Sequence, residues 1–416
     1  MSLKNCFILL FVLLSPMAYS QVDEVNPPDH IKTITFKGDT NESQLPILKL
    51  GDVLQLEFDA LNGDEEDFYY TIEHYNFDWT PSVLVKSEYL DGFDKQRITD
   101  YDNSFNTYQI YSHYKLKIPN QRTKRLKRSG NYLISVFNDY DELVFSRKFM
   151  IYENLAAVGV SLKRSRDVKF IKEKQTVDIG IASNSIQFNN PERTVKTLLI
   201  QNNNLNNTIS NLKPQYTLGK ELVYKYRNGS SFWGGNEYLY FDNKDIRGAT
   251  SAIKGIELKD LYHNFLYSNY ERATRPYTYN PDINGNFLIT SLDADYPNIE
   301  ADYAWIHFSL LSENLPENSN IHVYGNFNNY AIEEGTKMIY DEENQVYKNK
   351  MLLKQGFYNY KYIIIDANGL IDEGAISGNF YETENDYKVL VYYRELGARY
   401  DRIIGLGEGN SVNISN

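Results

Sequence analysis

Residues 72–119 read IEHYNFDWTPSVLVKSEYLDGFDKQRITDYDNSFNTYQIYSHYKLKIP, and they decide how the surrounding sequence is interpreted. The segment has too many aromatic and hydrogen-bonding side chains for an ordinary linker. On both sides of it, apolar and polar residues alternate, in 54–59, in 70–75 and in 132–137. Alternation with a period of two is typical of strands that bury one face. Residues 21–153 are therefore predicted to form a β-sandwich.

The same alternation continues along the chain, in runs such as 176–181, 195–201 and 303–310 that polar turns separate. One segment, 256–266, has a weak helical spacing instead. Gly130 and Tyr132 stand at the start of a strand-like run, as in the tyrosine corner of immunoglobulin-like sandwiches. The predicted fold class is all-β, with tandem immunoglobulin-like or early-set β-sandwich domains.

The chain is predicted to have five parts. Lys4, an apolar run at 7–14 and small residues at 18 and 20 indicate a cleavable signal peptide. The last residues are rich in glycine and asparagine and have little to bury, which predicts a loose tail. The predicted parts are a signal peptide at 1–20, an N-terminal β-sandwich at 21–153, a middle β-rich domain at 154–313, a C-terminal early-set immunoglobulin-like domain at 314–400 and the tail at 401–416.

Charge and apolar content limit the partners. The formal net charge is −12, and an acidic chain repels phosphate backbones, so no nucleic-acid partner is expected. No stretch after the signal approaches 18 consecutive apolar residues, so no transmembrane segment is expected in the mature chain. Cys6, the single cysteine, lies in the predicted signal peptide, which leaves the mature chain without a disulfide.

Catalytic and metal-binding patterns are absent from the sequence. Its histidines form no HxxH pair, and neither a nucleophile elbow nor a nucleotide-binding glycine pattern occurs. Paired acids, Asp293 with Asp295 and Glu300 with Asp302, are candidates for a glycosidase or a calcium site, but we expect them to be solvated acids in turns. We expect no enzyme activity, no catalytic residue, no cofactor and no metal.

Five blocks in the first predicted domain carry a resemblance to a known family. They are residues 78–81 (DWTP), 88–93 (EYLDGF), 104–107 (SFNT), 126–137 (LKRSGNYLISVF) and 145–149 (FSRKF). In this order they resemble the first domain of the type IX secretion system plug proteins. The resemblance implies a periplasmic protein on the inner side of the outer membrane. It also implies that the protein reversibly blocks the periplasmic mouth of the translocon barrel, its partner, without covalent chemistry.

We predict that the contact surface lies in the loop region around residues 78–81 and 88–93, because loops on rigid sandwiches commonly bind partners. The alternative is that Trp79, Leu90 and Phe93 are core residues that hold a long crossover. A basic run at 122–128 could meet an acidic partner or lipid headgroups, or could be a solvated hairpin. The predicted partner-binding residues are Asp78, Trp79, Glu88, Tyr89, Leu90, Asp91, Gly92 and Phe93.

The alternative function is periplasmic glycan binding through the C-terminal domain. Residues 323–330 and 356–362 resemble early-set immunoglobulin-like domains, and the glycogen-binding modules of that superfamily have a stacking tryptophan where this chain has Tyr330. Their lysine matches Lys361, whereas Leu370 or Ile371 stands where a second aromatic platform is expected. A third possibility is a hydrolase assembled from carboxylates between domains.

Overall fold

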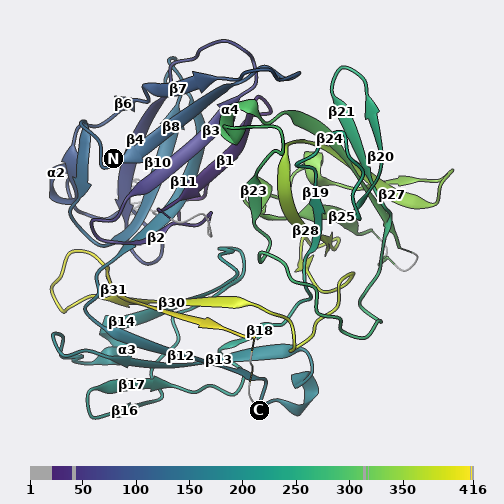
Figure 1. Cartoon of the computed structure of the whole chain (residues 1–416). Coiled ribbons are helices and arrows are strands. Elements are labelled where there is room, and N and C mark those ends of the chain that lie inside the picture. The colour runs from purple at the N-terminus through teal and green to yellow at the C-terminus, as the bar shows by residue number, and fades with distance from the viewer. Residues whose placement is uncertain (1–20, 40–43, 313–314, 317, 413, 415–416) are drawn as a thin grey trace, which may run out of the picture.

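The structure is a computed structural model of the chain, and it describes residues 21–39, 44–312, 315–316, 318–412 and 414. The predicted signal peptide, residues 1–20, lies outside the described residues. Figure 1 shows three lobes built of strands, so the all-β prediction is confirmed. The described helical pieces are short turns: α2 (Lys86–Tyr89), α3 (Pro191–Thr194), α4 (Pro297–Glu300), η1 (Val168–Phe170), η2 (Asn326–Asn328) and η3 (Glu334–Thr336).

The first lobe is a sandwich of two sheets whose shared core runs from Ile31 to Ile151. A short ribbon of two strands lies beside it. One sheet has the order β1 (Ile31–Lys37), β3 (Leu54–Ala60), β8 (Ser112–Ile118), β7 (Asp100–Asn103). The other has the order β2 (Ile47–Lys49), β11 (Leu143–Tyr152), β10 (Gly130–Phe137), β4 (Tyr69–Tyr75), β6 (Gln96–Arg97), and the ribbon pairs β5 (Leu90–Gly92) with β9 (Thr123–Leu126).

The tyrosine corner predicted at the start of β10 is present. Tyr132 is buried, and its hydroxyl donates a hydrogen bond of 2.8 Å to the carbonyl of Arg128, just upstream. Gly130 has a φ of 143°, and a Cβ there would lie 2.4 Å from Nε2 of His74. Only glycine therefore allows the chain to enter β10 against the His74 ring.

The second lobe is a sandwich made from two distant parts of the chain. Its core combines residues from Ala156 to Phe232 with residues from Tyr387 to Ile404. One sheet has the order β12 (Ala157–Arg164), β13 (Lys174–Ala182), β17 (Glu221–Tyr224), β16 (Tyr216–Leu218), with β18 (Ser231–Trp233) also on β13. The other has the order β15 (Thr208–Ser210), β14 (Val195–Gln201), β30 (Asp386–Tyr393), β31 (Arg402–Asn410).

The third lobe lies, in sequence, between these two parts, and its core runs from Phe241 to Ile376. One sheet has the order β19 (Leu239–Asp242), β28 (Gly356–Ile365), β23 (Phe287–Ile289), and β25 (Asn320–Tyr324) and β29 (Ile371–Asp372) also pair with β28. The other, six-stranded, has the order β20 (Ile253–Leu258), β21 (Tyr262–Leu266), β24 (Tyr303–Leu311), β27 (Val346–Lys354), β26 (Ile339–Asp341), with β22 (Asn269–Tyr270) on β24.

Strand pairing does not follow the predicted boundaries after residue 153. The predicted boundary at 313/314 would place β24 and β27 in different domains, although these two strands pair along their length. It would also separate β14 from its partner β30. The predicted tail is wrong for Arg402–Asn410, because this segment is β31 and buries Ile403 and Ile404. The helical expectation at 256–266 is also wrong, since the segment is the β20–β21 hairpin. The third sandwich is thus inserted into the second, rather than following it in tandem.

A separate apolar cluster joins the first and second sandwiches. Trp79, Leu133 and Met150 of the first contact Leu390 and Tyr392 of the second, among other residues. The Tyr392 hydroxyl donates to Oδ1 of Asn131 at 2.6 Å in the same junction, where both residues are buried. A packed apolar junction with a satisfied polar group fixes the two sandwiches relative to each other.

A buried ionic network joins the first and third sandwiches. The carboxylate of Asp59 on β3 accepts hydrogen bonds of 2.6 Å each from Nζ of Lys354, from the Tyr303 hydroxyl and from Nδ1 of His113. All four side chains are at most 3% exposed. Burial raises the pKa of Asp59, but the Lys354 ammonium and the His113 ring outweigh burial and hold it below its ordinary value. The junction therefore contains a buried ion pair whose acid, Asp59, lies on the first sandwich and whose base, Lys354, lies on the third.

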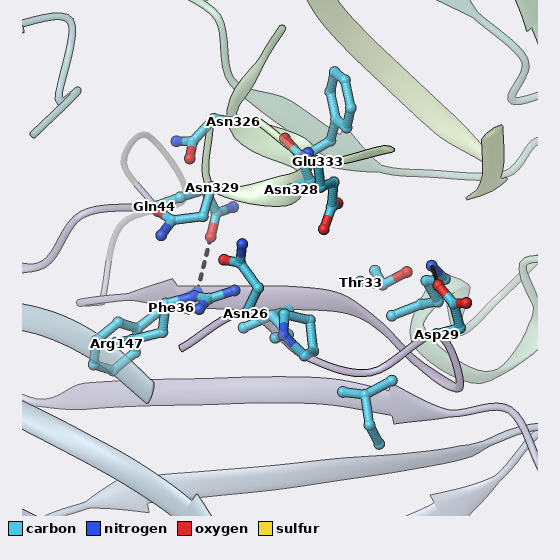
Figure 2. Close-up of a pocket in the computed structure, with 15 residues that line it drawn as sticks. Asn26, Asp29, Thr33, Phe36, Gln44, Arg147, Asn326, Asn328, Asn329 and Glu333 are labelled. Atoms are coloured by element: carbon cyan, nitrogen blue, oxygen red, sulfur yellow. Dashed lines mark hydrogen bonds and ion pairs between the residues drawn. The ribbon is translucent and has the colours of Figure 1, made fainter. Parts of the chain in front are cut away.

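The N-terminal segment adds a third tie, beside a small cavity of about 80 Å³ that Figure 2 shows in close-up. Glu24 accepts hydrogen bonds from the Lys148 backbone N–H at 2.5 Å and from Nδ2 of Asn329 at 2.7 Å. Arg147 is buried beside the cavity, and its Nη1 donates to the carbonyls of Ser146 and Val25. Segment 21–30 thus links the first sandwich to the third.

Candidate partner-binding surface

Residues 86–92 of the predicted contact region form α2, at the outer edge of the first sandwich (Figure 1), and β5, which pairs with β9 in the short ribbon. The turn of α2 begins after Val85, whose backbone N–H donates to the Glu88 carboxylate at 2.9 Å. The chain then extends into β5, which pairs with β9 from Leu90 opposite Leu126 to Gly92 opposite Thr123. A capped single turn followed by a ribbon fixes which side chains of the block face inward.

Trp79 is one of three predicted contact residues that lie in the interior. It is 8% exposed and belongs to the apolar cluster between the first and second sandwiches. Its φ of 59° closes the turn in which its N–H donates to the carbonyl of Asn76 at 3.0 Å. The Lys148 ammonium lies 4.6 Å from the ring centroid. Trp79 therefore holds a domain junction and has little surface left for a partner.

Tyr89 and Leu90 are the other two interior residues. They are 5% and 3% exposed and belong to the core of the first sandwich. The Tyr89 ring packs against His74, with ring centroids 5.5 Å apart. Burial raises the pKa of Tyr89 to about 12, so its hydroxyl stays protonated. The prediction that Tyr89 and Leu90 contact a partner is wrong for this conformation, and the core alternative also holds for Trp79.

Phe93 is the opposite case, since 76% of its surface is exposed. It follows Gly92, where a Cβ would lie 2.6 Å from the carbonyl oxygen of Arg122, so glycine is needed for β5 to approach β9. Asp91 pairs with Arg125 at 3.2 Å, and Asp78 is exposed and caps its own turn through Thr80. The alternative that Phe93 is a core residue is therefore wrong, because its side chain is exposed beside the ribbon.

The basic run contributes strand β9 to the same edge. Arg122, Lys124 and Arg125 are exposed, and Val83 and Val85 beside α2 are 63% and 60% exposed. Arg399, in the loop between β30 and β31, binds Glu88 through both of its Nη atoms at 2.8 and 3.2 Å. We name Val83, Val85, Asp91, Phe93, Lys124 and Arg125 the α2 surface. It combines exposed apolar side chains with cations, as partner-binding surfaces commonly do.

The valines were missed by the sequence analysis. Val83 and Val85 flank Leu84 in the run VLV, and the inward residue of the three, Leu84, packs against the first core. Alternation around that leucine could have placed both valines outside. The bonds of Glu88 to Arg399 could not have been found in this way, because 311 positions separate the two residues.

The residues of the glycan-binding alternative do not form an open site. Tyr330 is 3% exposed, and its ring packs on Tyr324 with centroids 5.0 Å apart. Lys361 is 9% exposed and forms an ion pair with Glu373. A stacking platform needs an exposed ring face, so the prediction that Tyr330 and Lys361 bind a glycan is wrong for this conformation.

The paired acids serve structural contacts. Asp293 pairs with Arg247, and Glu300 accepts the backbone N–H of Asp295 at 2.7 Å. Asp302 accepts the N–H groups of Tyr108 and Gln109 at 2.8 and 3.1 Å, across the junction of the first and third sandwiches. Among the described residues, no group of three or more His, Cys, Asp or Glu side chains could hold a metal ion.

In the described part of the chain, no helix combines the length and apolar character that crossing a membrane requires.

The comparisons with known proteins agree with the position of the sequence blocks. The family model described as "Type 9 secretion system plug protein 1st domain" matches residues 31–153, which include the first sandwich and the α2 surface. No curated protein matches the chain.

A crystal structure of a hypothetical protein from Parabacteroides merdae ATCC 43184 is similar over all three sandwiches. It is 31% identical to this chain, covers 94% of it and 100% of its own length, and gives a TM-score of 0.89. Trypsin-activated alpha-2-macroglobulin from Escherichia coli gives a TM-score of 0.19 at 7% identity, over 94% of this chain and 29% of that chain, which is too low to show a shared fold.

The first sandwich, from its first strand to its last, therefore matches the first domain of the type 9 secretion system plug proteins.

Proposed function

We propose that this chain is a periplasmic plug that reversibly closes the periplasmic mouth of the outer-membrane translocon barrel of the type IX secretion system. The match of residues 31–153 to the first domain of the plug proteins supports the link to secretion. Occlusion is steric and requires no covalent step, so the plug can be removed when the barrel engages its substrate carrier. In this proposal the protein is exported by a cleavable signal peptide at residues 1–20 and remains at the inner side of the outer membrane.

The observation that carries the proposal is the fixed arrangement of the three sandwiches. The first is joined to the second by the Trp79 cluster and to the third by the Asp59–Lys354 pair. A stopper must resist deformation, and packed junctions of this kind resist it better than flexible linkers do.

The size of such a body suits the opening. One sandwich of about 130 residues is roughly 35 Å across by compact-globule scaling, whereas about 400 residues packed as one body are roughly 55 Å across. The largest known barrels have about 36 strands, which at about 4.8 Å spacing and the usual tilt gives a diameter of roughly 70 Å. Three sandwiches held together can therefore cover most of such a mouth, and loops of the barrel can close the rest.

The α2 surface is the proposed contact with the barrel. It lies on the matched first domain and places Phe93 and two valines among cations. A modest interface of this type allows release, because affinity depends on a few exposed anchors rather than on one large apolar area.

The test is affinity purification of the tagged mature protein from detergent-solubilised envelopes. We expect one very large outer-membrane barrel to co-purify, without its substrate carrier. Phe93→Ser combined with Arg125→Glu should reduce the recovered barrel. The matched control is Val168→Ser combined with Arg227→Glu, which changes an exposed apolar side chain and an exposed arginine on the second sandwich. Recovery of no barrel with the unaltered protein would contradict the proposal.

A further inference from the structure

The six-stranded sheet of the third sandwich has one face on the core, and its other face is buried against the first sandwich at Tyr303 and Lys354 but open toward the opposite end of these strands. On β24, Ile306, Phe308 and Leu310 are at most 1% exposed and form the core face. Because strand side chains alternate, Trp305, His307 and Ser309 point to the other face. A groove of about 560 Å³ lies on this open face, above β21, β24 and β27.

Stacked rings form the floor of the groove. Phe265 on β21 is opposite His307 on β24, with ring centroids 4.2 Å apart and an interplanar angle of 23°. The adjacent His263 is hydrogen-bonded to His307 through Nδ1 and Nε2 at 2.8 Å. Burial and the neighbouring His263, Lys350 and Lys259 lower the pKa of His307 to about 4, so the ring is neutral near pH 7. The floor is thus aromatic and uncharged.

Lysines surround this floor. Lys350 lies directly opposite His307 on β27, with its ammonium 4.9 Å from the Trp305 ring centroid. Lys254 sits at a bulge in the pairing of β20 with β21, and a bulge re-aims the side chain that it contains. Lys337 follows η3 at the rim of the groove. We name Lys254, Lys337, Lys350, Phe265, His307 and Ser309 the lysine groove.

These cations have no counter-charge in contact. Among the described residues, no carboxylate oxygen lies within 4.0 Å of the ammonium groups of Lys254, Lys337 or Lys350. Lys348, which also lines the groove, is paired with Asp341. Glu334 is the acidic residue among those that line it. On a chain with a net charge of −12, the groove therefore concentrates positive charge over an apolar floor.

We infer that the lysine groove binds an acidic segment of a partner polypeptide, with carboxylates at Lys254, Lys337 and Lys350 and an apolar side chain on the rings of Phe265 and His307. Charge complementarity selects the carboxylates, and it steers association more than it raises affinity. The groove has the volume of a typical site for a few side chains, and its aromatic floor favours a segment that also carries an aromatic or aliphatic residue. The inference does not depend on occlusion, since it concerns a different sandwich from the α2 surface.

The experiment titrates the folded mature protein with a synthetic pentapeptide that has four acidic residues around a central phenylalanine. Binding is followed by calorimetry and by the histidine ring signals in NMR spectra. We expect the signals of His263 and His307 to shift, while that of His30, in the N-terminal segment, stays in place. A peptide with glutamines in place of the acids should not bind.

Two variants separate the groove from general charge effects. Lys254→Gln combined with Lys350→Gln should weaken peptide binding about fivefold to tenfold at low salt, as expected for two exposed ion pairs. Lys117→Gln combined with Lys220→Gln makes the same change of charge at exposed sites on the other two sandwiches, and should leave binding unchanged. Equal loss in both double variants, unmoved His263 and His307 signals, or binding of anionic lipid vesicles in place of the peptide would each overturn the inference.

Discussion

Replacing Lys354 with methionine would leave Asp59 buried between the first and third sandwiches without its cation. Breaking a buried pair by removing one partner costs about 3–5 kcal/mol. Asp59 would keep its hydrogen bonds from Tyr303 and His113, both of 2.6 Å. We therefore expect a loss near the lower limit, about 3 kcal/mol, in the free energy of unfolding. We expect the junction between the two sandwiches to open before either sandwich unfolds, since Lys354 and Asp59 lie on different sandwiches.

A second substitution distinguishes a lost pair from a damaged fold. Replacing both residues with apolar side chains of similar volume, Asp59→Leu with Lys354→Met, removes the uncompensated charge, and such replacements are often neutral or stabilising. The double variant should thus be more stable than Lys354→Met alone by about 2 kcal/mol or more, which a double-mutant cycle measures.

The assay is urea unfolding followed by tryptophan fluorescence, in variants that retain one tryptophan each. Trp79 reports on the junction of the first and second sandwiches, and Trp305 on the third. In the unaltered protein the two transitions should coincide, whereas Lys354→Met should move the Trp305 transition away from the Trp79 transition. Unchanged stability and coincident transitions in Lys354→Met would show that the Asp59–Lys354 pair does not stabilise the junction.

Three further predictions follow from the same contacts. Tyr89→Ala should cost about 3–5 kcal/mol because its ring is buried, whereas Phe93→Ser should change the urea midpoint little and weaken barrel recovery; equal destabilisation by both would be inconsistent with their burial. Burial lowers the pKa of His74 to about 4, so the neutral ring's contribution to the free energy of unfolding is fully present above the unfolded-state pKa of about 6.5 and is lost as pH falls toward 4, by up to about 3 kcal/mol. His74→Phe should remove this dependence of the free energy of unfolding on pH, and an unchanged dependence would exclude His74 as its source. Truncation before Arg402 removes β31 from the second sandwich, so proteolysis should cut residues 154–233 quickly, and full resistance would contradict the pairing of β30 with β31.

The first sandwich was predictable because its signals are local. Alternation in 54–59, 70–75 and 132–137 corresponds to β3, β4 and β10, and Gly130 with Tyr132 marked the tyrosine corner. The insertion of the third sandwich was not predictable in this way. It depends on Val195 pairing with Tyr393, and no local pattern tells a strand which distant partner it will have.

The error at the end of the chain has a related cause. Residues 402–410 contain three glycines and were interpreted as a tail, yet these glycines, at 405, 407 and 409, allow β31 to lie against β12. A Cβ at Gly405 would be 2.7 Å from the carbonyl oxygen of Ala156. Small residues that permit close packing look the same in sequence as small residues that permit disorder.

Three of the predicted contact residues are buried, and the spacing of the block did not indicate this. Consecutive residues Tyr89 and Leu90 are both buried because a helical turn ends and a strand begins between them. Neither the period of a helix nor that of a strand applies at such a change, so the exposed side of the block could not be read from its spacing.

The most direct test of occlusion is the ion conductance of the purified translocon barrel in a planar bilayer, measured before and after the mature protein is added on the periplasmic side. If the protein occludes the barrel, the conductance should fall and recover on washing, and it should fall less with Phe93→Ser combined with Arg125→Glu. A conductance that stays constant while the protein is shown to be bound would contradict occlusion.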